Sequence, residues 1–151
     1  MPFARIDLVQ GKPAAYRRAI ADVVYEAMLD VLKAPKDRFQ VISEHPFENH
    51  IAAENYLGIQ HTGDCVFIQL TLNAGRTLDQ KKSFYKAVAD GLHRRVGLRR
   101  EDVIIHLVEV LKEGTGPSVM ARPPTRADGQ SPAQYEKRSE FPNPPGRDFG
   151  A

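Results

Sequence analysis

The chain has 151 residues, enough for one domain with a proper core and too few for two full-sized domains. Its 21 basic and 19 acidic residues are spread along the chain, so we expect neither a nucleic acid nor a membrane surface as its partner. The single cysteine, Cys65, excludes an internal disulfide and a cysteine-based zinc site, and it favours a reducing, cytoplasmic location. No segment approaches the length that spans a bilayer, which predicts a soluble protein.

Residues 2–45 have the pattern of a β-α-β unit. Alternating apolar and charged residues predict a strand over residues 3–9. Apolar residues at helical spacing then predict an amphipathic helix of about five turns, which begins at Pro13 and ends before Pro35. After a polar turn, residues 39–43 are expected to form a second strand.

The same pattern repeats after a polar, irregular stretch. Residues 65–72 have the strongest strand signal, Thr77 can cap a helix that Gly97 ends, and residues 103–110 are expected to form the last strand. We therefore predict an internal duplication at a spacing of about sixty residues. The expected fold is α+β, with β-α-β units over residues 2–45 and 64–113. Two right-handed crossover helices cover one face of a four-stranded sheet, and the strands within each unit are parallel.

Residues 114–151 differ in composition from the rest of the chain. They hold seven of the eleven prolines and five of the eleven glycines, and Val119 is their only isoleucine, leucine or valine. Such a segment buries too little apolar surface to offset its chain entropy. We expect an irregular or disordered tail after a domain that ends near Glu113.

Pro2 is the first candidate for chemistry. Taken alone, a proline at the beginning of an edge strand needs no functional explanation. Methionine is generally removed before a small residue such as proline, which would leave a secondary amine at the chain terminus. A free α-amine has a pKa of about 8 in model compounds, so modest burial or a nearby cation brings its titration to neutral pH. A strand that begins at Phe3 would hold such an acid/base group rigidly.

Several motifs together resemble the tautomerase superfamily. They are the Met-Pro start of a β-α-β unit, the second unit about sixty residues later, and residues 37–45 (Asp-Arg-Phe-Gln-Val-Ile-Ser-Glu-His). The most specific is Leu-Asn-Ala-Gly-Arg-Thr at residues 72–77, followed by Gln-Lys-Lys at 80–82. Residues 2–113 are most similar to the branch that includes malonate semialdehyde decarboxylase, which has the tautomerase/MIF-like fold. The resemblance implies a homotrimer, no metal, no organic cofactor, and a small carboxylate substrate in a pocket around the N-terminal proline.

The resemblance assigns roles to three residues. Pro2 would be the catalytic acid/base, Arg76 would bind the substrate carboxylate, and Asp37 would assist the proline. An arginine fits because its planar fork pairs both carboxylate oxygens and stays charged. From spacing alone, ordinary roles are the better explanation: a solvated turn residue for Arg76 and a turn or strand-entry residue for Asp37. The decarboxylase has two arginines in this turn, whereas Ala74 stands in the place of the first one.

We therefore expect a cofactor-independent tautomerase that acts on a small keto or enol carboxylate. One alternative is a β-keto acid decarboxylase of the malonate semialdehyde type. The other is a catalytically silent trimer that only binds ligands or partners.

The remaining reactive residue types have simpler explanations. The histidines have no metal-ligand spacing with one another, which favours surface or core roles for His45, His50, His61, His93 and His106. Cys65 opens an apolar strand and is interpreted as core packing. The lysines and arginines of the second helix are expected to form its solvated face.

The tail also raises a hypothesis about the gene. In relatives of this branch, a Lys-Glu pair after the last strand precedes a segment resembling Asn-Trp-Ser-Phe-Gly-Asn-Gly, whose aromatic residues wall the pocket. Here Lys112 and Glu113 are followed by Gly114. Back-translation from two bases into the Gly114 codon is compatible with that segment throughout. We hypothesise a frameshift before residues 114–151, which would reduce or abolish activity; the alternative is a genuine variant tail.

Overall fold

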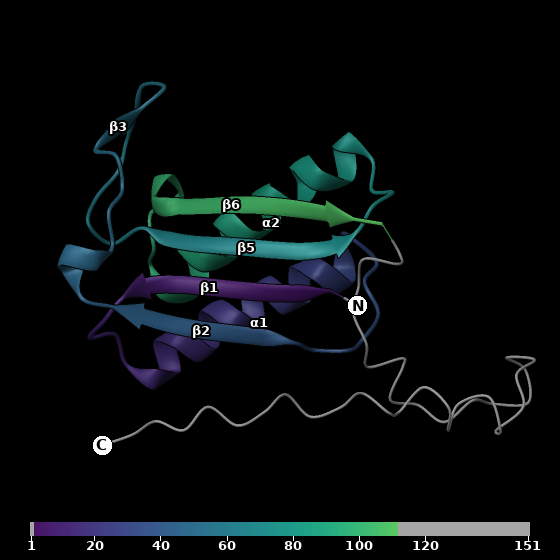
Figure 1. The fold of residues 1–151 in the computed structure, drawn as a ribbon, viewed down its shortest axis with the longest axis horizontal. Coiled ribbons are helices and arrows are strands. Elements are labelled where there is room, and N and C mark those ends of the chain that lie inside the picture. The colour runs from purple at the N-terminus through teal and green to yellow at the C-terminus, as the bar shows by residue number, and fades with distance from the viewer. Residues whose placement is uncertain (1, 112–151) are drawn as a thin grey trace, which may run out of the picture. The chain divides into compact units, whose positions relative to one another are not determined.

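The computed structural model describes residues 2–111, which form two β-α-β units within one four-stranded sheet (Figure 1). The first unit consists of β1 (Phe3–Val9), α1 (Ala14–Asp30) and β2 (Gln40–His45). The second consists of β5 (Val66–Asn73), α2 (Leu78–Val96) and β6 (Val103–Val110). β1 and β2 are parallel, as are β5 and β6, and the units join through antiparallel β1 and β5 in the order β2-β1-β5-β6. The predicted fold class is confirmed.

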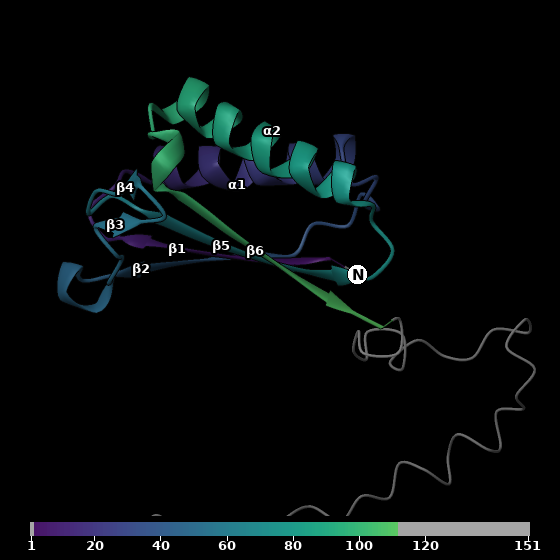
Figure 2. The same ribbon diagram turned by 90° about the horizontal axis from the view of Figure 1, so that it is seen from above.

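Both helices cover the same face of the sheet (Figure 2). Every second residue of the two central strands points to that face, because successive side chains of a strand alternate between its two sides. The strands contribute Ala4, Ile6, Leu8, Val66, Ile68, Leu70 and Leu72 to the core. The helices contribute Ile20, Val24, Met28, Phe84, Val88 and Leu92. Each large side chain in this layer contributes about 1.5–3 kcal/mol to folding when fully buried.

The two helices end in different ways. α2 begins with a capping box between Thr77 and Gln80 and ends at Gly97, whose φ of 70° is left-handed, as predicted. α1 ends at Asp30, earlier than the Pro35 stop that we expected. The chain turns away from the helix here, with Lys33 at a φ of 51° and the Ala34 N–H donating to the Met28 carbonyl. The predicted helix was therefore about one turn too long.

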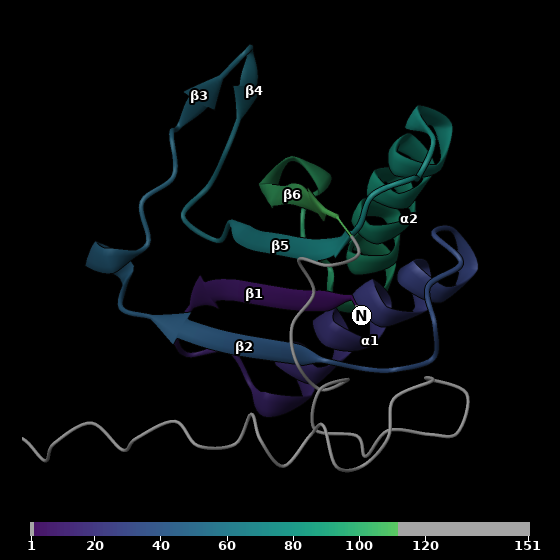
Figure 3. The ribbon, with the colours of Figure 1, turned by 45° about the vertical axis from the view of Figure 1, so that its right-hand side comes forward.

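The segment between β2 and β5 is more regular than expected. It contains a short 3₁₀ turn (Phe47–Asn49) and a two-stranded hairpin of β3 (Asn55–Tyr56) and β4 (Ile59–Gln60), which extends away from the main sheet (Figure 3). Leu57 and Gly58 form its turn with φ values of 53° and 81°. Two successive positive φ values are typical of a type I′ hairpin turn, for which leucine gives no sequence signal.

Neither helix among residues 2–111 is long and apolar enough to cross a membrane. The prediction of an irregular or disordered tail and the frameshift hypothesis both concern residues 114–151, which lie outside the described residues.

Candidate active site

The three predicted site residues all lie at one end of the sheet. Phe3 of β1 pairs with Thr71 near the end of β5, and Ala4 pairs with Gln40 at the start of β2. The strand register therefore brings Pro2, the segment before β2 and the turn after β5 to the same end. Pro2 is buried there, directly before the first strand residue.

Asp37 lies in the loop that enters β2. The Ala4 N–H donates to the Phe39 carbonyl over 3.0 Å, which fixes the end of this loop beside the beginning of β1. The neighbouring Arg38 turns toward α1 and donates to the Asp22 carboxylate over 2.6 Å. Asp37 itself is exposed. Among residues 2–111, no hydrogen bond or ion pair joins it to Pro2 or Arg76.

Arg76 lies in the tight turn between β5 and α2. Gly75 precedes it with a φ of 119°, a conformation that strongly favours glycine. The Ala74 N–H donates to the Val110 carbonyl over 2.9 Å, which extends the pairing of β5 and β6 into the turn. The Arg76 Nη1 donates to the Asn73 carbonyl over 2.6 Å. This bond uses one of the five guanidinium donors and leaves the partly exposed group capable of pairing with an anion.

An ion pair beside this turn was not predicted from the sequence. Lys81, expected on the solvated face of α2, donates to the Glu109 carboxylate of β6 over 2.6 Å. Glu109 pairs in register with Leu72, so it occupies a strand position that faces the helices. An acidic residue at such a position, after Ile105 and Leu107 on the same face, was the signal that could have pointed to it.

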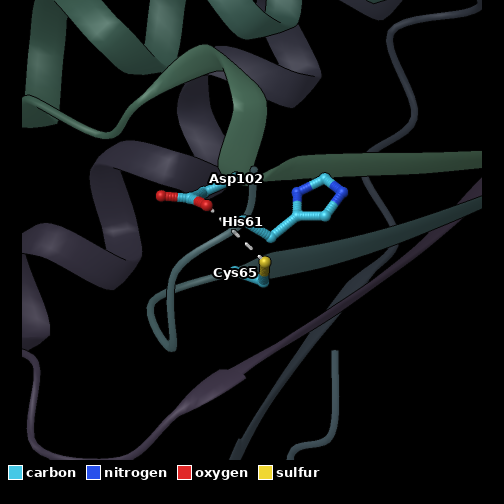
Figure 4. Close-up of side chains that lie close together, drawn as sticks. All are labelled: His61, Cys65 and Asp102. Carbon is cyan, nitrogen blue, oxygen red and sulfur yellow. Dashed lines mark hydrogen bonds between the residues drawn. The ribbon is translucent and has the colours of Figure 1, made fainter. Parts of the chain in front are cut away.

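A second cluster of reactive residue types lies at the opposite end of the sheet (Figure 4). One ligand atom each of His61, Cys65 and Asp102 lies within 4.8 Å of the others. Asp102 is almost fully buried, and its two carboxylate oxygens accept 2.7 Å hydrogen bonds from the Thr62 N–H and hydroxyl. The His61 Nδ1 lies 2.6 Å from the Glu101 carbonyl. These bonds tie the loop before β5 to the beginning of β6.

The polar atoms of this cluster are largely engaged in internal contacts. Thr62 donates to both carboxylate oxygens of Asp102, and one imidazole nitrogen of His61 lies beside the Glu101 carbonyl. Burial, followed by the neighbouring Asp102 charge, raises the pKa of the Cys65 thiol to about 11, which disfavours the reactive thiolate. The cluster therefore holds the loop before β5 against the beginning of β6, which agrees with the interpretation of Cys65 as a core residue.

Two hollows in the described surface lie away from the predicted site. One of about 490 Å³ lies between α1 and α2 and is lined by residues such as Val23, Glu26 and Arg94. The other, of about 460 Å³, is lined only by residues from the 47–63 segment. Neither contains Pro2, Asp37 or Arg76.

Family comparisons agree with this architecture. Two family models, both described as tautomerase enzyme, match residues 2–58 and 37–114. The chain is 32% identical over 108 residues to a probable tautomerase, YusQ, of Bacillus subtilis (strain 168), covering 71% of this chain and 85% of that protein. It is also 32% identical over 111 residues to the probable tautomerase YrdN of the same organism, covering 72% and 84%.

Solved structures provide a second comparison. A malonate semialdehyde decarboxylase inhibited by 3-bromopropiolate is 34% identical, with a TM-score of 0.70 over 76% of this chain and 87% of that one. Another malonate semialdehyde decarboxylase, studied for decarboxylase and hydratase activities, is 28% identical with a TM-score of 0.70 over 76% and 88%. A fused 4-OT described as a symmetric trimer shares the fold at 20% identity, with a TM-score of 0.64 over 77% and 91%.

Proposed function

The chain belongs to the tautomerase family, and from this premise we propose that it interconverts the keto and enol forms of a small carboxylate without a cofactor. The observation that carries the proposal is the strand register, which brings Pro2, Arg76 and Asp37 to one end of the sheet. Relatives named as probable tautomerases at 32% identity support the reaction class.

The proposed chemistry begins with a free Pro2 amine, which requires removal of Met1 because an amide nitrogen has no basic lone pair. Arg76 binds the substrate carboxylate and orients the carbon that bears the α-proton of the keto group toward the proline. Neutral Pro2 takes the α-proton; the C–H electron pair forms the enolate, and the negative charge develops on the carbonyl oxygen. The protonated Pro2 then delivers its proton to that oxygen, which gives the enol and restores the neutral amine; the reverse sequence returns the keto form.

Decarboxylation of a β-keto acid is the second candidate. It is favoured by the 34% identity to a malonate semialdehyde decarboxylase. In this reaction a cationic Pro2 polarises the carbonyl, and Asp37 assists. Ala74 counts against it because it replaces the first of two arginines that the resemblance leads us to expect in this turn. The two reactions need opposite protonation states of Pro2, so their pH profiles should differ in direction.

The sheet face opposite the helices supports a homotrimer. Phe3, Val41 and Val108 lie on that face with 41%, 39% and 38% of their surface exposed. Apolar strand residues on a sheet face that neither helix of residues 2–111 covers are suited to contact further copies of the chain. A catalytically silent trimer with the same face is the third candidate, and only activity measurements separate it from the two enzymes.

The test is an assay of phenylpyruvate-type enols and of malonate semialdehyde with the wild-type chain and Pro2→Ala. A tautomerase converts the enol in a Pro2-dependent way and requires the neutral amine. Turnover that is unchanged without the proline contradicts both enzymatic candidates. No turnover of either compound by the wild-type chain favours the silent trimer, whose oligomeric state sedimentation would measure.

A further inference from the structure

Asn73, the last residue of β5, has a buried side-chain acceptor without a partner. No donor among residues 2–111 is hydrogen-bonded to its Oδ1. Buried side-chain acceptors nearly always have a hydrogen-bond partner, because an unpaired one loses its hydration and gains nothing in return. The backbone of Asn73 is held in place by β6, where the residue pairs in register with Val110. The unpaired oxygen therefore lies on a fixed part of the sheet and has the capacity to accept one more donor.

The strand register relates this oxygen to the nitrogen of Pro2. Phe3 and Thr71 are opposite each other in the antiparallel pair of β1 and β5, so the next pair outward is Pro2 and Leu72. The nitrogen is the first backbone atom of Pro2, and it is directed outward along the strand, toward the position opposite Asn73. Because side chains alternate along β5 and Leu72 is buried under the helices, the Asn73 amide leaves on the helix-free face.

Asn73 also contacts Arg76. The Arg76 Nη1 donates to the backbone carbonyl of Asn73 over 2.6 Å, so the guanidinium lies directly beside this residue. The bond uses the backbone oxygen and leaves the side-chain oxygen available. Asn73 thus touches the candidate anion-binding group and stands across the sheet from the candidate acid/base, which no other residue at this end of the described chain does by a printed bond and by register together.

We infer that Asn73 is a positioning residue, whose side-chain carbonyl accepts a hydrogen bond from the protonated Pro2 amine. This inference rests on the proposed function, because it requires the free amine. After Pro2 takes the α-proton, its nitrogen carries two N–H bonds. One of them donates to Asn73, and the other points to the substrate and returns the proton. Asn73 itself gains and loses no proton.

The titration of the Pro2 amine tests the inference without substrate or turnover. Nitrogen NMR of protein with isotope-labelled proline measures it, because a terminal amine is the one kind of proline nitrogen that titrates. Asn73→Leu keeps the size of the side chain and removes the acceptor, so the midpoint should fall by about one pH unit. Asn73→Asp places a negative charge beside the ammonium and should raise the midpoint. A purely structural role does not predict shifts of opposite sign.

The matched control is Gln69→Leu, which removes an exposed amide from the same strand and the same face. It should leave the midpoint unchanged. Enol conversion gives a second measurement, because it requires the neutral amine: kcat/KM should reach its plateau at a lower pH in Asn73→Leu and at a higher pH in Asn73→Asp. If Asn73→Leu does not fold, Asn73→Ala removes the same acceptor and takes its place with the same expectation.

The outcomes separate the inference from the proposed function. A midpoint that both Asn73 variants leave unchanged, or that both move in the same direction, overturns the inference and leaves the proposed function standing. The expected opposite shifts, together with unchanged enol turnover in Pro2→Ala, support the hydrogen bond and overturn the proposed function. A wild-type chain without a titrating proline nitrogen overturns both, because Pro2 is then an amide.

Discussion

The two ends of the four-stranded sheet both gather residues of reactive types, and they differ in how those residues are bonded. At one end, His61, Cys65 and Asp102 are drawn together, and Thr62 occupies both oxygens of the Asp102 carboxylate. At the other end, no bond joins Pro2, Asp37 and Arg76 among the described residues, although the strand register brings them to one place. The cluster of His61, Cys65 and Asp102 thus has a structural role. The candidate active site is the group whose side chains are not bonded to one another.

This contrast shows that proximity alone does not identify a site. A side chain whose hydrogen bonds are satisfied internally has little capacity left for a ligand, whereas a group held by the backbone can offer its donors to a substrate. The comparison predicts that changes at the Pro2 end alter activity and that changes at the Asp102 end alter stability.

The largest expected effect comes from blocking the chain terminus. One extra residue before Pro2 turns its nitrogen into an amide, which should lower kcat for enol conversion by about 10²–10⁴-fold, the contribution of general acid/base catalysis. Intact mass before the assay establishes which terminus each sample has. The control is the same extension at the C-terminus. Equal rates for blocked and free termini would contradict the proposed role of Pro2.

Arg76→Ala should lower kcat/KM by about 100-fold, because a paired, charge-assisted contact with the substrate carboxylate is lost. Steady-state kinetics with phenylpyruvate measure this change. The matched control is Arg38→Ala at the same sheet end, since Arg38 is already engaged with Asp22. A comparable loss in the control would mean that the effect reflects the general positive charge at this end.

Asp102→Ala should destabilise the fold by about 2–3 kcal/mol, because the two hydrogen bonds from Thr62 to the buried, charged carboxylate are lost. Urea denaturation followed by circular dichroism measures the loss. Asp37→Ala is the control, and as an exposed substitution it should change the stability by less than about 0.5 kcal/mol. Activity per folded molecule should stay the same in Asp102→Ala.

The contribution of Asp102 should depend on pH. Burial raises the pKa of Asp102, but the Thr62 hydrogen bonds and the Arg99 charge outweigh burial, so the net pKa is lowered. A carboxylate whose pKa is lower in the folded than in the unfolded state stabilises the protein fully at a pH above its unfolded-state pKa. This stabilisation is lost as the pH falls through its folded-state pKa. Below about pH 4 the wild type should therefore lose stability faster than Asp102→Asn. Parallel acid profiles of the two proteins would argue against a charged Asp102.

The smallest expected effect concerns Cys65. Because the thiol is buried and its pKa is raised to about 11, iodoacetamide at pH 8 should not label the folded protein but should label it fully in urea. Mass spectrometry measures the labelling. Rapid labelling in the folded state would show that Cys65 becomes accessible without unfolding. It would then support a chemical role for this end of the sheet.

The main sheet was predictable from sequence because β1 alternates apolar and charged residues, β5 and β6 are rich in β-branched residues, and the second helix has a strong cap and stop. The hairpin turn at Leu57 was not, because a leucine in a left-handed conformation gives no local signal. The end of α1 was misplaced because Pro35 is a strong sequence signal, whereas the local turn that ends the helix earlier, with Lys33 at a positive φ and the Ala34 N–H bonded to the Met28 carbonyl, has none.

The candidate site was predictable only in part. Pro2, Arg76 and Asp37 came from a family resemblance, and nothing in their spacing predicts that β1 and β5 would pair antiparallel and bring them to one end. The Lys81–Glu109 ion pair and the Thr62–Asp102 hydrogen bonds join residues that are distant in sequence. Such pairs follow from the strand register, which local patterns do not specify.

The antiparallel pairing of β1 and β5 relates the two units by an approximate two-fold rotation. That rotation carries the beginning of β1 onto the beginning of β5, at the opposite end of the sheet. The chain enters β5 through a peptide bond, so this second location has no terminal amine. Two equivalent halves thus give two symmetry-related locations but only one chain terminus to fill them, and the second location holds the contacts of Thr62 with Asp102 instead.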